Sequence, residues 1–323
     1  EYLGQIPIPN SGCGSWLFEP QSSNLLTYSS DYNNSIWTKT GSASVTSNTT
    51  ISPDGTQNAD TLNIFSGNFF FQPVVGVGTF TLSCYVKVPN GTLDFKMQSF
   101  NGTDGANSSA IFVATTEWQR FEHTVTVTVN SSFYPIQVSG LVGGDFEIWG
   151  AQVEALSYAT SYIPTEGSTV TRNQDLCNNG GSLASINSTS GTLYFEGAAL
   201  SNSFDNDGLI RIGNSLDTGG ESVDFRFDTT QNRVQIVVRA GGVNQTTSGV
   251  IITDTTANNK FALKYKANDI ALWVNGIERI LVSSASVPTG LDNISFLNFY
   301  SKTKAVAVWK EALSDSELQS LTT

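Results

Sequence analysis

The sequence offers few side chains of the kinds that catalyse reactions. Its one histidine, His123, falls in the alternating run 121–129 on the same face as several valines, a pattern typical of a buried imidazole. Neither a second histidine nor a cysteine near it in sequence completes a zinc site or a nucleophilic pair. Asp224 and Asp228 share an outward strand face, but residues i and i+4 of an extended strand are about 13 Å apart, which exceeds the separation that glycosidases use. The sequence therefore predicts a protein that is not an enzyme.

Outward aromatic side chains point instead to sugar binding, in which a ring stacks on the apolar face of the sugar and polar groups bind its hydroxyls. In the run 270–274, Leu272 and Val274 face inward, so Trp273 projects from the opposite face beside Asn275. Arg226, outward on another strand, offers paired donors. The alternative is that Trp273 is a surface tryptophan covered by a loop or a neighbouring subunit.

The first half of the chain contains a second set of candidate aromatic residues. Tyr85 faces outward on its strand, and the run Asn68-Phe69-Phe70-Phe71-Gln72 carries aromatic residues on both faces. Either Phe69 and Phe71, or Phe70, must therefore face away from the core. These rings could form a sugar platform, or they could form an interface with another protein.

Metal and disulfide sites are less clearly marked. Asp205 and Asp207 offer oxygen ligands of the kind that Ca²⁺ favours, but Asn-Asp-Gly is also an ordinary turn sequence. No other cofactor is expected. Cys84 lies on an apolar strand face and is predicted to be a buried, inert thiol. Cys13 and Cys177 lie in Gly/Asn-rich segments and would form a disulfide if those segments meet in space.

Composition excludes several classes of partner. The chain has 323 residues and a net charge of −12, and it carries neither a basic patch nor a cationic amphipathic helix, so binding to nucleic acid or to an anionic membrane is not expected. No apolar run approaches the roughly 20 residues of a membrane-spanning helix. Because the sequence has no initiating Met and no leader, we expect it to be a processed or excised piece of a longer protein.

Periodicity predicts an all-β protein made of two β-sandwich domains with one short C-terminal helix. Short runs with a period of two are separated by turn sequences such as Pro-Asn-Gly-Thr and Asn-Gly. The helical signal is Ser314-Asp315-Ser316-Glu317, which has the spacing of a capping box and is flanked by leucines.

The run around Trp149 is apolar on both faces of its expected strand. Phe146 and Ile148 suit one face, while Trp149, Ala151 and Val153 make the other face apolar as well. A strand of this kind needs cover on both sides. We therefore expect Trp149 and Val153 to form an interface with the second domain or with another subunit.

Two junction segments resemble segments that recur in tail and virion-surface proteins of bacteriophages. They are LFEPQSSNLLTYS at 17–29 and the combination of WGAQVE at 149–154, SYIPT at 161–165 and VTR at 170–172. The region between them is similar to a jelly-roll carbohydrate-binding module, on the residues Trp37, SPDGT at 52–56, ADTL at 59–62, YVK at 85–87 and Trp118. The region after Arg172 is similar to concanavalin-like or laminin-G-like lectin domains, through LWVNG at 272–276 and VWKEALSDSEL at 308–318.

The resemblance implies a domain organisation and a function. It implies an N-terminal segment 1–23 that pairs with the second domain, a carbohydrate-binding-module-like domain at 24–165 and a lectin-like domain at 166–323. We expect a non-enzymatic fibre, spike or head decoration on the virion surface, outside the cell, that binds glycans of a host surface or of the environment. Its partners would include other virion proteins, and fibres of this class are often trimeric. Two alternatives stay open: a structural decoration without sugar binding, and a carbohydrate-binding appendage of a secreted polysaccharide-degrading enzyme.

Overall fold

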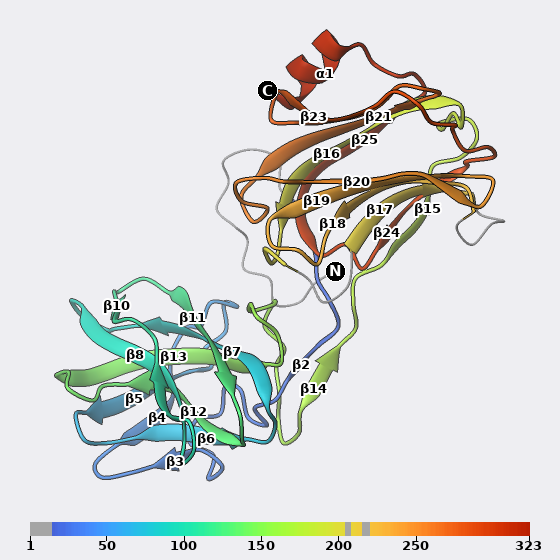
Figure 1. The fold of residues 1–323 in the computed structure, drawn as a ribbon. Helices are drawn as coiled ribbons and strands as arrows, with labels where there is room; N and C mark the ends of the chain where they lie inside the picture. Colours follow the sequence, from blue (N-terminus) through green and yellow to red (C-terminus); the bar gives the residue numbers. More distant parts are fainter. Residues whose placement is uncertain (1–14, 204–207, 215–219) are drawn as a thin grey trace. The chain divides into compact units, whose positions relative to one another are not determined.

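The structure is a computed structural model that describes residues 15–203, 208–214 and 220–323. The described chain forms two compact units, each with its own hydrophobic core (Figure 1). Unit 1 is Gln21–Asn173, and unit 2 comprises residues 15–20 and Gln174–Thr323. Among the described residues no helix has the length and apolar character that crossing a membrane would require.

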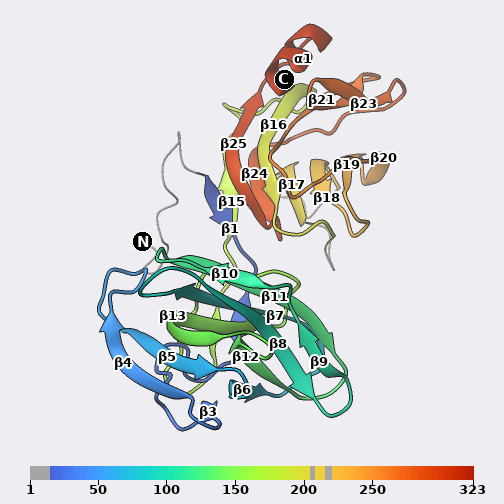
Figure 2. The ribbon, with the colours of Figure 1, turned by 90° about the vertical axis from the view of Figure 1, so that its left-hand side faces the viewer.

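Unit 1 is a sandwich of two antiparallel sheets with a small two-stranded ribbon. One sheet has the strand order β11 (Gln119–Val127), β7 (Gly78–Lys87), β13 (Gly143–Glu154), β5 (Ala59–Phe65), β4 (Ser44–Thr50). The other has the order β10 (Phe112–Ala114), β8 (Leu93–Asn101), β12 (Ser131–Gln137), β6 (Phe70–Val74), β3 (Thr38–Lys39). The short strand β9 (Gly105–Ser108) also pairs with β8. The ribbon pairs β14 (Val170–Arg172) with β2 (Ser22–Asn24). Figure 2 shows the same strands after a quarter turn.

Alternating side chains build the core of unit 1. Phe95 and Met97 of β8 face Val86 of β7 and Phe146 of β13, and all four are buried. Cys84 is a free, buried thiol in the same core, and burial raises its pKa to about 12. The thiol is therefore protonated at neutral pH, which agrees with the predicted inert role.

A β-bulge in β13 changes which side chains face the core. Trp149 pairs with Tyr85 and Gln152 pairs with Ser83, so β13 carries one extra residue there. Gly150 occupies the bulge at φ +65°, a conformation that favours glycine. Beyond the bulge, Val153 returns to the core that Ile148 already faces, whereas a regular strand would have placed it beside Trp149.

The predicted interface at Trp149 and Val153 is therefore wrong. Trp149 is only 3% exposed, but the residues that cover it belong to unit 1. Tyr162, from the segment that follows β13, places its ring centroid 4.5 Å from that of Trp149, and Tyr85 lies at 5.4 Å. Val153 is part of the core because of the bulge. The strand does need cover on both faces, and its own chain supplies that cover.

Unit 2 is a second antiparallel sandwich. Its first sheet has the order β1 (Trp16–Phe18), β25 (Ser301–Trp309), β16 (Ser190–Ala199), β21 (Asn259–Lys266), β22 (Ile270–Val274), β23 (Ile277–Val282). Its second sheet has the order β15 (Cys177–Gly180), β24 (Asn293–Leu297), β17 (Gly208–Gly213), β18 (Ser222–Phe227), β19 (Arg233–Ala240), β20 (Val243–Ile251). Buried phenylalanines from both sheets, among them Phe195, Phe225 and Phe261, pack against one another between the sheets.

One α-helix, α1 (Asp315–Thr322), packs on the outer face of the first sheet of unit 2 (Figure 1). It begins with the predicted capping box, in which Ser314 and Glu317 bond each other's backbone N–H. Its Leu318 is fully buried against Tyr194 and Trp273. The all-β fold with a short C-terminal helix is therefore confirmed.

The limits of the two units differ from the boundaries expected at 24 and 165. Unit 1 continues to Asn173 because β14 returns to pair with β2. The short strand β1 pairs with β25, so residues 15–20 belong to unit 2.

Candidate functional site

An aromatic patch lies on the outer face of the second sheet of unit 1. The Phe69 ring meets the Tyr134 ring edge-on at 6.2 Å, and the Phe71 ring lies 4.8 Å from it. Phe69 is 38% exposed and Phe71 is partly exposed, whereas Phe70 is buried in the core. Of the two orientations that the sequence left open, the structure therefore shows Phe69 and Phe71 facing outward. We call Phe69, Phe71 and Tyr134 the aromatic patch.

Polar side chains continue from the aromatic patch across the sheet. Tyr134 pairs with Gln98, and Gln98 pairs with Ser108, whose hydroxyl donates to the Gln98 Oε1 at 3.0 Å. On the other side Phe71 pairs with Thr38 of the edge strand. The cross-strand row from Thr38 to Ser108 bridges five strands, or about 19 Å at the usual spacing of about 4.8 Å between strands.

The Tyr85 side chain lies on the opposite sheet of unit 1 and does not join the aromatic patch. It is sandwiched between Trp149 and Arg120, whose guanidinium carbon lies 5.4 Å from the Tyr85 ring centroid. Burial raises the pKa of the Tyr85 hydroxyl. Tyr85 therefore serves mainly to cover the second face of β13.

The prediction of an open sugar platform at Trp273 is wrong. The indole does project from the outer face of β22, as alternation requires, but it is only 8% exposed because α1 covers it. Tyr194, on β16, which lies two strands from β22 in the same sheet, is covered in the same way. Trp273 thus belongs to a small second core of unit 2, as the alternative interpretation held, with a helix as the cover.

The expected partners of Trp273 are occupied elsewhere. Asn275 takes a φ of +48° in the turn before β23, accepts the Lys260 N–H at 2.9 Å and donates to Asn259 at 2.8 Å. Arg226 lies on the other sheet of unit 2, where it forms a 2.8 Å ion pair with the buried Asp224. The structure therefore does not bring Trp273 and Arg226 together.

The residues considered for catalysis have structural partners. His123 contacts the Asn107 carbonyl at 3.3 Å, and burial lowers its pKa. Arg211 donates twice to Asp224, at 2.8 and 2.9 Å, and Arg233 pairs with Asp228 at 2.8 Å. Asp224 and Asp228 thus both form ion pairs with arginines, and His123 belongs to unit 1.

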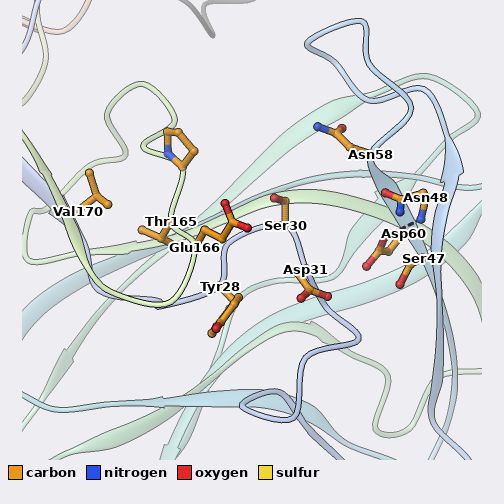
Figure 3. Close-up of a pocket in the computed structure, with 11 residues that line it drawn as sticks. Tyr28, Ser30, Asp31, Ser47, Asn48, Asn58, Asp60, Thr165, Glu166 and Val170 are labelled. Atoms are coloured by element: carbon orange, nitrogen blue, oxygen red, sulfur yellow. Dashed lines mark hydrogen bonds between the residues drawn. The ribbon is translucent and has the colours of Figure 1, made fainter.

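A polar pocket of about 770 Å³ lies in unit 1, beside the segments that lead into and out of the sandwich (Figure 3). Its lining includes the carboxylates of Asp31, Asp60 and Glu166 and the amides of Asn48 and Asn58. In Figure 3 the Glu166 carboxylate points toward Ser30, and Asp31 and Asp60 approach from the other side. We call this the junction pocket.

The proposed metal site and the proposed disulfide are not described. Asp205, Asp207 and Cys13 lie outside the described residues, so the Ca²⁺ site and the pairing of Cys13 with Cys177 stay predictions. Within the described ranges, no group of three Asp, Glu, His or Cys side chains is arranged to hold a metal ion. Cys177 begins β15 and packs against the core of unit 2.

Several residues of these sites escaped sequence reasoning. Tyr134 lies on the outer face of β12, and Gln98 lies on the outer face of β8. The alternation of side chains in the sequence could have predicted that both face outward. Only the pairing of the strands places them beside Phe71. The junction pocket combines segments near positions 30, 48, 60 and 166. No local pattern links those segments, because the fold alone brings them together.

Comparison with known proteins gives structural neighbours only. No protein-family model and no curated protein matches the sequence. The carbohydrate-binding module CBM40 of the Ruminococcus gnavus IT-sialidase aligns at a TM-score of 0.37 and 18% identity, over 45% of this chain and 94% of that chain. The tandem CBM22 modules of Paenibacillus barcinonensis Xyn10C align at a TM-score of 0.32 and 11% identity, over 97% of this chain and 96% of that chain. Mouse laminin α1 domains LG4-5 align at a TM-score of 0.29 and 8% identity, over 96% of this chain and 92% of that chain. Such low scores leave the function to be argued from the residues of this chain.

Proposed function

We propose that the protein is a non-catalytic glycan-binding protein whose first unit holds an oligosaccharide on the aromatic patch. The observation that supports this most is the outward pair formed by the exposed Phe69 and the partly exposed Phe71, both of which contact the Tyr134 ring. Aromatic rings accept the apolar face of a sugar, and flanking amides and hydroxyls bind its polar groups. Gln98, Ser108 and Thr38 supply those groups in the same cross-strand row.

The shape of the row favours a chain over a single sugar. The row extends about 19 Å at the normal strand spacing, which is long enough for several linked sugar rings. Its polar groups are amide and hydroxyl side chains of strands, which cannot move far because the sheet fixes them. The ligand class that fits is therefore an extended oligosaccharide or polysaccharide segment.

A glycan array with the whole protein tests this function, followed by titration of the best-bound oligosaccharide. The variant carrying Phe69→Ala and Phe71→Ala should bind about tenfold more weakly or worse, equivalent to about 1.4 kcal/mol or more. Phe65→Ala is the matched control, because Phe65 is 44% exposed on the other sheet. Absence of binding to every glycan, or equal losses in both variants, would contradict the proposal.

The proposed place of action is the surface of a bacteriophage particle, outside the cell. Support comes from the resemblance of the junction segments to virion-surface proteins and from a sequence rich in Ser, Thr and Asn. Partners in the particle and trimeric assembly belong to the same proposal. Immunogold labelling of particles should mark the virion, and light scattering should give the subunit number. Labelling confined to a secreted enzyme would favour an enzyme appendage instead.

A structural decoration remains a second candidate, favoured by exposed valines at the loops of unit 1. Val75 and Val142 are 82% and 83% exposed. Exposed apolar side chains of this kind suit contact with another protein. If this candidate holds, changing both valines to Ser should abolish incorporation into the particle, and the glycan array should be negative.

A further inference from the structure

Phe100 is a further exposed aromatic side chain on the same sheet face as the aromatic patch. On β8, Phe95 and Met97 face the core, so alternation turns Phe100 to the outer face together with Gln98. Phe100 is 44% exposed. The outer face of this sheet thus carries a large apolar ring outside the row that runs from Thr38 to Ser108.

The cross-strand neighbours of Phe100 are small. Phe100 pairs with Ser132 of β12 on one side and with Ala106 of β9 on the other. Neither side chain is long enough to cover a phenylalanine ring, so the ring stays open to solvent. A single exposed apolar side chain is ordinary, whereas several that lie together mark a binding surface. The distance between Phe100 and the aromatic patch therefore decides its meaning.

Strand register fixes that distance. Phe71 lies on β6, two strands from β8, and Phe100 lies two residues beyond the row of Phe71 and Gln98. Two strand spacings of about 4.8 Å and two residues of about 3.4 Å place Phe71 and Phe100 about 12 Å apart, diagonally across the sheet. Six-membered rings joined by single oxygen atoms repeat about every 5 Å at bond lengths of about 1.5 Å. Two sugars stacked on these two residues are therefore separated by at least one further sugar.

Polar groups flank this diagonal. It crosses β12 between Tyr134 and the partly exposed Ser132, and Gln98 lies beside Phe100 on β8. The Gln98 Oε1 accepts the Ser108 hydroxyl at 3.0 Å, whereas its amide nitrogen has no partner among the described residues and is not enclosed by them. This nitrogen has two N–H donors for sugar hydroxyls, and a serine hydroxyl can donate and accept. The residues along the diagonal are uncharged, which suits a neutral chain.

The separation of the two rings also selects the linkage of the chain. Pyranoses joined through equatorial bonds form an extended ribbon, in which each sugar presents an apolar C–H face that an aromatic ring can accept. Pyranoses joined through an axial bond form a coil, which turns successive faces in different directions. Only the ribbon lays two sugar faces on one side of a sheet at the positions of Phe71 and Phe100.

We propose that Phe71 and Phe100 are two stacking subsites of one glycan site, and that its ligand is a neutral oligosaccharide of at least three equatorially linked pyranoses. One sugar stacks on Phe71 and another on Phe100, and the sugar between them binds Gln98 and Ser132. This inference rests on the function proposed above, because it names the ligand class of the same sheet face.

The test is NMR titration of the whole protein with cellohexaose, xylohexaose and mannohexaose, with the corresponding disaccharides, and with maltohexaose. Maltohexaose consists of the same glucose as cellohexaose but has axial linkages. The best-bound equatorial hexaose should bind about tenfold tighter than its disaccharide and than maltohexaose. Phe100→Ala should lose about tenfold in affinity for that hexaose and no more than about twofold for the disaccharide, because a disaccharide on Phe71 does not reach Phe100.

Two further variants control for indirect effects. Phe65→Ala should keep its affinity for the hexaose, because Phe65 is equally exposed, at 44%, but lies on the other sheet. Phe100→Trp should keep the affinity as well, because an aromatic ring remains at the subsite. A loss in Phe100→Trp as large as in Phe100→Ala would overturn the stacking role.

The variant carrying Phe69→Ala and Phe71→Ala separates this inference from the proposed function. If that variant loses the hexaose and Phe100→Ala does not, the aromatic patch stands and the second subsite is refuted. Equal losses of hexaose and disaccharide in Phe100→Ala would refute the length requirement. Tighter binding of maltohexaose, or no binding of any equatorial hexaose, would refute the ligand class, while a glycan array without any binding would refute the proposed function itself.

Discussion

At the scale of single residues, most charged side chains of unit 2 that are buried have a structural task. Asp224 lies on the outer face of β18 yet is fully buried, between Arg211 and Arg226. Burial alone would raise its pKa, but the hydrogen bonds and charges of the two arginines outweigh burial and hold the pKa below its ordinary value. The carboxylate is therefore ionised at neutral pH, where it forms ion pairs with both arginines.

Replacing Asp224 with Asn should destabilise unit 2 by about 3–5 kcal/mol, because two partly buried arginines lose their counter-charge. A carboxyl group with a lowered pKa stabilises the fold above its unfolded pKa of about 4, and this contribution is lost as pH falls further. Urea unfolding at neutral pH and at acidic pH measures both effects. The difference between wild type and variant should shrink in acid, whereas Glu311→Gln, an exposed change, should show no difference at either pH.

At the scale of elements, the junction segments form one assembly inside unit 1. The buried Asn24 side chain donates to the carbonyls of Ala151 and Ile163, at 3.2 and 2.9 Å, and accepts the N–H groups of Leu26 and Val153. The Gln152 amide accepts the Ile163 N–H at 2.6 Å. These bonds attach the segment after β13 to the outer face of its sheet, where Tyr162 then covers Trp149.

Gly150 is the residue on which that arrangement depends most. Its φ of +65° is unfavourable for other residues, and an added Cβ would lie 3.3–3.4 Å from the rings of Tyr85 and Tyr162. We expect Gly150→Ala to lower the stability of unit 1 by about 1–2 kcal/mol or more. Thermal unfolding measures the loss. Gly102→Ala is the control, because Gly102 has no close neighbour, and a loss as large there would refute the role of the bulge.

At the scale of the whole molecule, two separate cores predict two separable unfolding transitions. The core of unit 1 and the core of unit 2 share no residue. Leu318→Ala removes a fully buried side chain of α1 and should destabilise unit 2 by about 2–5 kcal/mol. In calorimetry this variant should shift one transition, while Gly150→Ala shifts the other. A single transition that both variants shift equally would contradict independent units, and the exposed Gln319→Ala should shift neither.

The sequence by itself determined the secondary structure and the alternation of side chains. A period of two fixes which residues of a strand share a face, so Cys84, Phe95 and Val86 could be assigned to a core without a structure. The capping box of α1 could be read from four residues, because its hydrogen bonds are local. The outward direction of Trp273 followed from the same alternation.

Only the tertiary structure decided what lies on the outward faces. Trp273 is covered because α1 packs on that face, and α1 begins 42 residues after Trp273 in the chain. The faces of Trp149 and Val153 depend on one inserted residue in β13, and a shift of one residue exchanges the two faces of a strand. Strand pairing makes neighbours of Phe71, Tyr134 and Gln98. The junction pocket forms where segments near positions 30, 48, 60 and 166 come together. Both candidate sites therefore depend on contacts between residues distant in sequence.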